Sequence, residues 1–291
     1  MREVALVRSA GSTARDFAML TKPRLSTLVL ITAGGGMWLA GAFGLRGWLT
    51  LLAIHGVVAS ANAFNCVLER DSDRYMARTL SRPLPAGRMD PWVAVVFAAG
   101  LALVSLPALM MLANPLTAAL GLLALVLYVG VYTPLKPRTH WAMVVGAVPG
   151  AIPPLMGWTA MTDEISRPGV ALFLILFFWQ LPHFIAIALF RMPEYRKARL
   201  ESVPLALGED SARAFVVAYT LALAVVSELP YRFAVVSAGY LGVAAALNAA
   251  FLAYAMYGWV TRAGPGWARR AFFATLAQLT GLFAALALFR A

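Results

Sequence analysis

The chain alternates long apolar runs with short polar connections. About nine runs are long enough to cross a hydrocarbon layer of about 30 Å as helices, and they lie at 25–45, 48–68, 92–112, 116–134, 141–161, 169–190, 212–229, 233–257 and 268–289. The runs are too long for membrane barrel strands and lack the alternation of such strands. The pattern therefore predicts an all-α, polytopic membrane protein with about nine transmembrane helices.

Glycine and proline interrupt several runs, at 34–36, Pro149, 153–154 and Pro182. Such breaks are tolerated in a membrane where neighbouring helices or a cavity satisfy the freed backbone groups. We find no stretch that suggests a soluble domain or a low-complexity linker. We therefore expect one transmembrane domain, 1–291, in which 1–24 is a cytoplasmic N-terminal segment.

The composition supports a lipid environment. The chain is 61% hydrophobic and 13% charged, with a mean hydropathy of +0.76, whereas soluble proteins carry roughly 25% charged residues. So little charge cannot cover a globular surface in water. The single cysteine, Cys66, excludes an internal disulfide and a zinc site built from cysteines.

The basic residues give the expected orientation. The formal net charge is +11, and the Lys and Arg residues lie in the N-terminal segment and in alternate connections, except for Arg46, Arg167, Arg232 and Arg290. The positive-inside rule then places the N-terminus in the cytoplasm and the C-terminus outside. Membrane topology explains these short basic loops better than binding to nucleic acid does.

Acidic and basic residues are crowded together in the stretch 62–88. Asn65, Glu69 and Asp73 are spaced i, i+4, i+8, so on a helix they share one face. Three oxygen donors at a helix end suit Mg²⁺, which also takes substrate phosphate oxygens. Asp71 is a secondary candidate: it joins the ligands only if the helix unwinds, or it holds Arg74 or Arg78.

The same stretch carries Arg74, Arg78 and Arg82. Guanidinium groups match pairs of phosphate oxygens, so acids interleaved with arginines indicate a site for a metal-bridged diphosphate. The alternative is an ordinary solvated loop with i, i+4 ion pairs. The regular Asn-x₃-Glu-x₃-Asp spacing, together with a second charged cluster, favours a functional site.

That second cluster lies within 179–204. Glu194, at the cytoplasmic end of an apolar run, could supply a further metal ligand, and Arg191 could contact phosphate. Trp179 and Gln180 lie in the apolar run, where polar side chains are costly and suggest function.

His183, in the same run, has three interpretations: a base or proton donor, a contact to a porphyrin, or a buried histidine satisfied by a helix carbonyl. Trp179, Gln180 and Tyr195 join it as candidates for contact with a porphyrin or for proton transfer.

Two further basic elements are expected on the same face: 132–140, with Lys136 and Arg138, and 21–26, with Lys22 and Arg24. The four elements together describe a cytoplasmic mouth of carboxylates and cations above a cavity in the lipid. Such a site suits a substrate with an anionic head and an apolar tail. A prenyl diphosphate fits this description, because cations stabilise the charge that develops on its leaving group.

Four segments resemble the UbiA superfamily of intramembrane prenyltransferases: TKPRLSTLVLITAGGGMWLA, FNCVLERDSDRYMARTLSRPL, YTPLKPRTHWAMVVGAVPGAIPPLMGW and WQLPHFIAIALFRMPEYRKA. The patterns MxRTxxRPL, GAxPPLxGW and WQxPHF are similar to those of its protoheme IX farnesyltransferase (haem O synthase) branch. The resemblance covers about residues 17–210. It implies a UbiA-type helical bundle whose central cavity opens to the cytoplasmic face.

The resemblance also implies roles for residues. The metal ligands would be Asn65, Glu69, Asp73 and Glu194, and the diphosphate contacts would be Lys22, Arg24, Arg74, Arg78, Arg82, Lys136, Arg138 and Arg191. The implied cofactor is Mg²⁺, with Mn²⁺ as a substitute.

The branch joins farnesyl diphosphate to a vinyl group of haem b, with water, and gives haem O and diphosphate. The resemblance thus implies haem b as a substrate, the bacterial inner membrane as the location, and haem A synthase or terminal oxidase assembly factors as partners.

The chain departs from the family pattern at three points. Cys66 stands where many members carry a second acid or amide, and Glu69 replaces the commoner Asp. In 198–204, ARLESVP replaces a run nearer to AGIPMLP, so that Glu201 adds charge where proline is usual.

Two alternatives remain at this point. The first is another UbiA-type enzyme that acts on an aromatic or quinone precursor. The second, from a different class, is a cation transporter or a haem-handling membrane protein. Acids at the membrane boundary, interleaved with arginines, argue against a cation pathway.

Overall fold

The computed structural model describes residues 10–41 and 44–291, and their secondary structure is helical apart from one isolated β-bridge between Val236 and Arg290. The expectation of an all-α protein is confirmed. The helices are α1 Ala10–Leu20, α2 Pro23–Ala40, α3 Leu45–Leu68, α4 Pro91–Leu112, α5 Pro115–Val126, α6 Thr133–Leu135, α7 Ala142–Thr162, α8 Arg167–Phe190, α9 Met192–Lys197, α10 Val203–Leu207, α11 Glu209–Val226, α12 Leu229–Arg232, α13 Ala238–Val260 and α14 Pro265–Leu288, with a short 3₁₀ helix η1 Ser72–Tyr75 and a π-helix η2 Leu127–Tyr132.

In the described part of the chain, 8 helices are long and apolar enough to cross a membrane. They correspond to the second to ninth predicted runs. The first predicted run, 25–45, forms α2, which is not among them, because Arg24 in its first turn and three consecutive glycines dilute its apolar content. The predicted end of that run includes 42–43, which lie outside the described residues.

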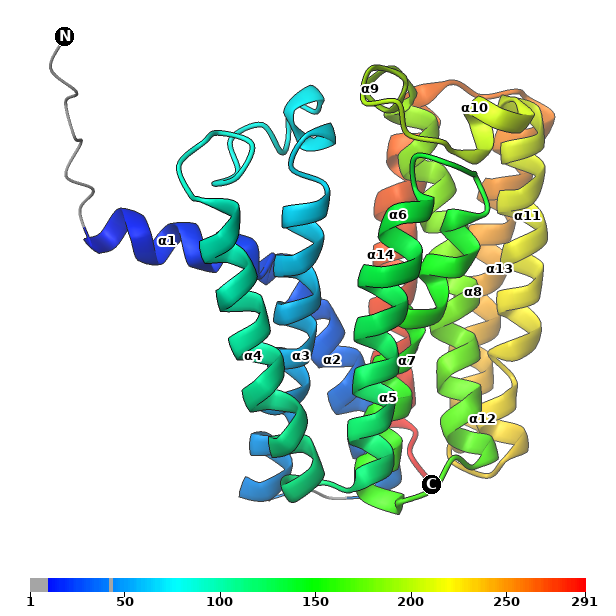
Figure 1. The fold of residues 1–291 in the computed structure, drawn as a ribbon. Coiled ribbons are helices and arrows are strands. Elements are labelled where there is room, and N and C mark those ends of the chain that lie inside the picture. Colours follow the sequence, from blue (N-terminus) through cyan, green and yellow to red (C-terminus); the bar gives the residue numbers. More distant parts are fainter. Residues whose placement is uncertain (1–9, 42–43) are drawn as a thin grey trace, which may run out of the picture.

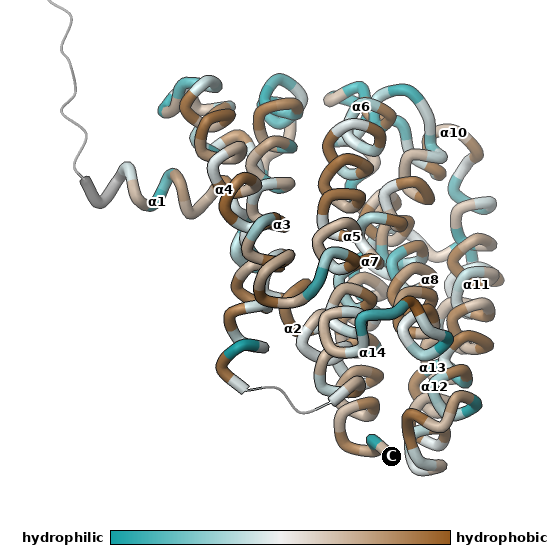
Figure 2. Tube along the Cα trace, turned by 60° about the horizontal axis from the view of Figure 1, so that its bottom comes forward, coloured by the Kyte–Doolittle hydropathy of each residue, from teal (hydrophilic) through white to brown (hydrophobic). Residues whose placement is uncertain are grey.

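Figure 1 shows the long helices side by side, with the C-terminus at the end of the bundle opposite to the connections that carry α9 and α10. Helix α7 packs between α2 and α8, and α14 packs against α2, α8 and α13, so the two halves of the chain form one bundle. Hydrophilic residues gather at the turns, while the helices are largely hydrophobic (Figure 2). Leu103 and Met111 on α4 are 75% and 78% exposed, which suits contact with lipid tails.

Helices α2 and α7 approach each other very closely. A Cβ atom at Gly36 would collide with the carbonyl oxygen of Pro154, and one at Gly157 would collide with that of Ala33. Small residues allow such contacts between membrane helices, whose association depends on close packing. This crossing fixes α2, and therefore the Lys22 side chain just before it, relative to the rest of the bundle.

Candidate active site

The first acidic motif, Asn65, Glu69 and Asp73, does not lie on one continuous helix as predicted. Helix α3 ends at Leu68, Glu69 follows as its C-cap with φ −91° and ψ 2°, and Asp73 lies in η1. The chain leaves the helical path where it enters the charged run 69–71. The backbone N–H of Asp73 still donates to the carbonyl oxygen of Glu69 at 2.8 Å, and this bond keeps the motif compact.

Asn65 is the buried end of this motif and connects three segments. Its Oδ1 accepts a hydrogen bond from Lys22 Nζ, and its Nδ2 donates to Thr133 Oγ1 at 3.1 Å. Thr133, which was not among the predicted site residues, also donates to the carbonyl oxygen of Tyr128 at 2.8 Å. The two partners, Lys22 and Thr133, are 43 and 68 positions from Asn65 in the chain. The spacing of the motif therefore does not predict them.

A π-helical turn, η2, positions Thr133 and Lys136. The turn ends the long span 115–135 next to the motif. Pro134 has no N–H to donate to the carbonyl of Gly130, and π-turns within helices are often found at functional sites. The wider turn also places the ring of Tyr132 against Gly146, where a Cβ atom would collide with it.

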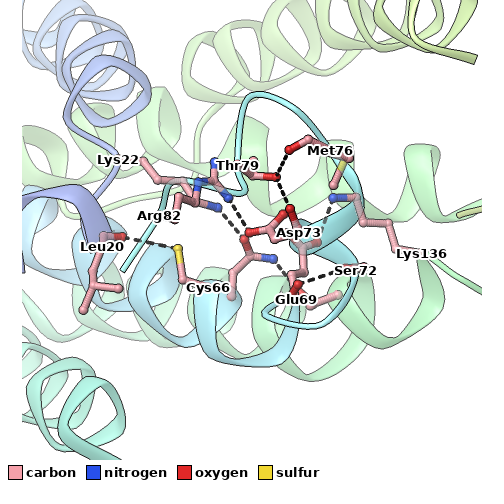
Figure 3. A network of polar contacts seen from close by, with 12 residues as sticks. Leu20, Lys22, Cys66, Glu69, Ser72, Asp73, Met76, Thr79, Arg82 and Lys136 are labelled. Atoms are coloured by element: carbon pink, nitrogen blue, oxygen red, sulfur yellow. Dashed lines mark hydrogen bonds and ion pairs between the residues drawn. The ribbon is translucent and has the colours of Figure 1, made fainter. Parts of the chain in front are cut away.

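Glu69 is paired with a lysine. Its Oε1 accepts from Lys136 Nζ at 2.7 Å, and its side chain is 11% exposed. Burial alone would raise the pKa of Glu69, but Lys136 and Lys22 outweigh burial and hold this pKa at about 2. Conversely, burial lowers the pKa of Lys136, but the Glu69 carboxylate holds it well above its ordinary value. Glu69 is therefore an anion at neutral pH. Figure 3 shows it beside Lys136.

Asp73 is almost completely buried, at 1% exposure, and accepts from Arg82 Nη1 at 2.7 Å through Oδ2 (Figure 3). Its other oxygen, Oδ1, is buried without a hydrogen-bond partner. The hydroxyl of Thr79 donates to the Asp73 carbonyl oxygen at 2.8 Å, which ties η1 to the loop that follows. One oxygen of this carboxylate is therefore held in place while the other is available.

Glu194 on α9 has the same arrangement. Arg191 Nη1 donates to its Oε1 at 2.6 Å, and its Oε2 is buried without a partner. The two acidic loops touch each other, because Met76 packs with Ala198 and Leu200 in a small buried cluster. The described structure therefore brings both acidic motifs to the same end of the bundle.

These donors fit a hard cation in kind. Amide and carboxylate oxygens are what Mg²⁺ prefers, and Asp73 and Glu194 each present a buried oxygen with no protein partner. In the described part of the chain, however, no three His, Cys, Asp or Glu side chains lie close enough to hold one metal ion. The assignment of Asn65, Glu69, Asp73 and Glu194 as metal ligands therefore stays a prediction.

The predicted phosphate contacts fall into two groups. Each member of the first group bonds a residue of an acidic motif: Lys22, Arg82, Lys136 and Arg191. The members of the second group are exposed and make no side-chain hydrogen bond or ion pair to any described residue: Arg24, Arg74, Arg78 and Arg138.

Asp71 differs from its prediction. It is 74% exposed and pairs with Arg70 at 3.6 Å, rather than with Arg74 or Arg78. The helix ends before this residue, so the rotation expected from an ideal helix does not apply. Arg74 instead lines an open pocket of about 470 Å³ with Arg70 and Arg88, on the outside of the first acidic loop.

Trp179, Gln180 and His183 are buried in α8. His183 Nδ1 bonds Thr275 Oγ1 at 2.8 Å, so its partner is a hydroxyl of α14 and not a helix carbonyl. Trp179 Nε1 donates to the carbonyl oxygen of the same Thr275 at 2.7 Å.

Gln180 Nε2 donates to the carbonyl oxygen of Leu176 at 3.0 Å. Tyr195 is half-buried and packs beside the Met76 cluster.

The structure also places two of the departures from the family pattern, Cys66 and the run 198–204. Cys66 is directed away from the acids, since its Sγ donates to the carbonyl oxygen of Leu20 at 3.8 Å. Arg199 has φ 53°, in the left-handed region, where the family run has glycine. The side chain of Glu201 is exposed, and its N–H donates to the Lys136 carbonyl oxygen at 3.1 Å.

Comparison with known proteins decides the family. The model of the UbiA prenyltransferase family matches residues 28–277. The chain belongs to the UbiA prenyltransferase family. The resemblance inferred from the sequence is confirmed, and this UbiA protein is a prenyltransferase of the multi-pass membrane class.

Relatives of this UbiA protein match almost its whole length. It is 56% identical over 288 residues to a protoheme IX farnesyltransferase of Myxococcus xanthus (strain DK1622), covering 98% of both chains. It is 48% identical over 275 residues to a protein of the same name from Anaeromyxobacter sp. (strain Fw109-5), covering 94% of this chain and 93% of that one.

Solved structures show the same fold. A digeranylgeranylglyceryl phosphate synthase superposes with a TM-score of 0.80 at 18% identity, over 96% of this chain and 98% of that one. A UbiA homologue from Archaeoglobus fulgidus, bound to DMAPP and Mg²⁺, superposes with a TM-score of 0.65 at 17% identity, over 94% of this chain and 100% of that one. The UbiA-type helical bundle is therefore confirmed.

Proposed function

We propose that this UbiA protein transfers the farnesyl group of farnesyl diphosphate to a vinyl group of haem b and forms haem O. The observation that carries the proposal is the pairing of each acid of the two motifs with a base at one end of the bundle. The high identity to proteins named protoheme IX farnesyltransferase supports haem b as the acceptor.

The reaction breaks the bond between C1 of the farnesyl chain and the diphosphate oxygen. C1 forms a new bond to the terminal vinyl carbon, a water oxygen adds to the inner vinyl carbon, and that water releases a proton. The products are haem O with a hydroxyethylfarnesyl side chain and free diphosphate. Negative charge therefore develops on the leaving group, where fixed cations help most.

The residues divide into two roles. Lys22, Lys136, Arg82 and Arg191 would donate hydrogen bonds to the diphosphate, since each already bonds a residue of one of the two acidic motifs. Mg²⁺, with Mn²⁺ as a substitute, would be held by Asn65, Glu69, Asp73 and Glu194 and would supply positive charge to the leaving diphosphate.

The location of the site and its partners follow from the same proposal. The site would open to the cytoplasm, where the short basic connections lie, in the inner membrane of a bacterium. Haem O would pass to haem A synthase or to factors that assemble terminal oxidases. His183, Trp179, Gln180 and Tyr195 remain candidates for contact with haem or for proton transfer.

The test uses purified full-length protein in lipid or detergent, with haem b, farnesyl diphosphate and Mg²⁺, and mass spectrometry of the porphyrin products. Formation of haem O supports the proposal. A parallel reaction with 4-hydroxybenzoate in place of haem b tests the alternative UbiA activity. A prenylated benzoate and unchanged haem b would replace the proposal with that alternative.

A further inference from the structure

We infer that Asp16 and Arg88 are positioning residues that hold Arg82 in place and, through it, aim the carboxylate of Asp73. The inference rests on the proposed function for the identity of the substrate and for the role of Asp73 as a metal ligand. Neither Asp16 nor Arg88 belongs to the predicted site residues, and neither touches an acid of the two motifs in the described structure.

The first step is a buried ion pair. Asp16 on α1 is 4% exposed, and its Oδ1 accepts from Arg88 Nη2 at 2.9 Å and from Arg88 Nε at 3.2 Å. Two bonds from one guanidinium group fix its plane as well as its position. Because a buried carboxylate is costly without a partner, the pair is strongly favoured once α1 has docked.

The second step leads from Arg88 to the segment that carries Arg82. Arg88 Nη2 also donates to the carbonyl oxygen of Ser81 at 3.0 Å, and its backbone N–H donates to the carbonyl oxygen of Pro83 at 2.8 Å. Arg88 thus bonds both neighbours of Arg82 in the sequence. The backbone on either side of Arg82 is fixed by a residue that Asp16 itself orients.

The third step leads to the acid. Arg82 Nη1 donates to Asp73 Oδ2 at 2.7 Å, while Asp73 Oδ1 is buried without a partner. Because this bond fixes one carboxylate oxygen, it also sets where the second oxygen points. A small displacement of Arg82 would therefore move an oxygen that the proposed function assigns to metal binding.

Helix α1 is itself packed against the bundle, so it can hold Asp16 in a fixed position. Leu20 is 1% exposed and packs in one cluster with Cys66 of α3 and Leu84 of the Arg82 loop. Phe17 packs against Phe97 of α4, with ring centroids 4.9 Å apart and ring planes tilted by 55°. Figure 1 shows α1 crossing the bundle rather than running along it. The described part of the predicted N-terminal segment, 10–24, therefore contributes to the site and not only to topology.

The test measures Mg²⁺-dependent binding of farnesyl thiodiphosphate, an analogue that reacts slowly, by titration calorimetry on the full chain in detergent. Asp16→Asn should weaken this binding about tenfold, as loss of a residue that supports a metal ligand typically does. Arg82→Lys should weaken it by a similar factor. The affinity of the double variant for the analogue should also be about tenfold lower, rather than about 100-fold lower, because both changes act through the same series of contacts to Asp73.

The control is another ion pair with a largely buried member that makes no contact with Asp73. Glu209 and Arg213 pair at 2.6 Å at the start of α11, on the same end of the bundle, and Arg213 is 5% exposed. Glu209→Gln should leave analogue affinity within about twofold of the wild-type value. An equal loss in Glu209→Gln and Asp16→Asn would mean general destabilisation and would overturn the inference. Additive losses in the double variant, or unchanged binding by Asp16→Asn, would also overturn it.

Arg88→Lys keeps the test decisive if Asp16→Asn does not fold. A lysine keeps the charge, but its compact ammonium group cannot reproduce the planar two-point contact to Asp16 together with the bond to the Ser81 carbonyl. It should weaken analogue binding about tenfold while thermal unfolding remains near that of the wild type. Normal binding by folded Arg88→Lys would overturn the inference. Wild-type protein that binds the analogue but forms no haem O would overturn the proposed function alone.

Discussion

Lys136 Nζ lies 2.7 Å from Glu69 Oε1, and this pair joins the turn after α3 to the end of the α5–α6 span. The two residues are 67 positions apart in the chain. Since Lys136 and Lys22 hold the pKa of Glu69 at about 2, this acid is available as an anion throughout the neutral range. The contact thus keeps Glu69 ionised and places a cation beside it.

Removal of only one member of this pair should be more harmful to the fold than removal of both. Lys136→Met leaves a largely buried carboxylate unpaired and should lower the free energy of unfolding by about 3 kcal/mol. Lys136→Met with Glu69→Leu should restore most of that stability, while both variants lose haem O formation. Thermal unfolding and product analysis measure the two effects separately. Equal stability of the single and double variants would contradict this account of the pair.

Arg199 occupies a left-handed backbone position, with φ 53°. A side chain with a Cβ atom is disfavoured there by about 1–2 kcal/mol, and glycine removes this strain at some cost in unfolded-state entropy. Arg199→Gly should therefore raise the unfolding free energy by about 0.5–1 kcal/mol. Arg199→Ala is the matched control, because it removes the same charge but keeps the Cβ atom. A gain in Arg199→Ala as large as that in Arg199→Gly would assign the effect to charge instead.

The close crossing of α2 and α7 should tolerate no added methyl group. Gly157→Ala places a Cβ atom against the carbonyl oxygen of Ala33 and should cost about 2 kcal/mol of stability. Gly100→Ala on α4 is the control, because nothing lies within 4 Å of its added Cβ atom. It should be neutral or stabilising, since alanine favours a helix by up to about 1 kcal/mol over glycine. Equal melting temperatures for the two variants would contradict the close approach.

The bond between His183 Nδ1 and Thr275 Oγ1 should contribute to stability. Thr275→Val keeps the shape but leaves the ring nitrogen unpaired, which should cost about 1–2 kcal/mol. The KM for farnesyl diphosphate should not change, because Thr275 bonds none of the acidic residues in the described structure. Thr280→Val, at an exposed position of α14, serves as the control. A raised KM with unchanged stability in Thr275→Val would instead link this pair to the diphosphate site.

Much of the fold follows from the sequence, because long apolar runs allow few structures other than helices in a membrane. The eight runs from 48–68 to 268–289 correspond to the helices that could cross it. The first run, 25–45, was also predicted and forms α2, Pro23–Ala40, but this helix is less apolar and is not among those eight. The π-turn at 127–132 depends on packing against α7, which periodicity does not report.

The sequence shows the residue types of the candidate site but not their arrangement in space. The motif spacing singled out Asn65, Glu69 and Asp73, whose roles stay a prediction. It assumed a helix through Asp73, whereas α3 ends at Leu68. Thr133 and Thr275 were missed because ordinary threonines carry no signal until a distant segment supplies their partners. Asp16 was missed for the same reason, since its partner Arg88 is 72 residues away.

The most direct test of the central claim compares wild-type protein and Asp73→Asn in one assay with haem b, farnesyl diphosphate and Mg²⁺, followed by mass spectrometry. The account predicts haem O from the wild type, none after chelation of Mg²⁺, and a loss of about 100-fold in folded Asp73→Asn, which keeps the shape of the side chain but removes its charge. Unmodified haem b from folded wild-type protein, or full haem O formation by Asp73→Asn, would contradict it.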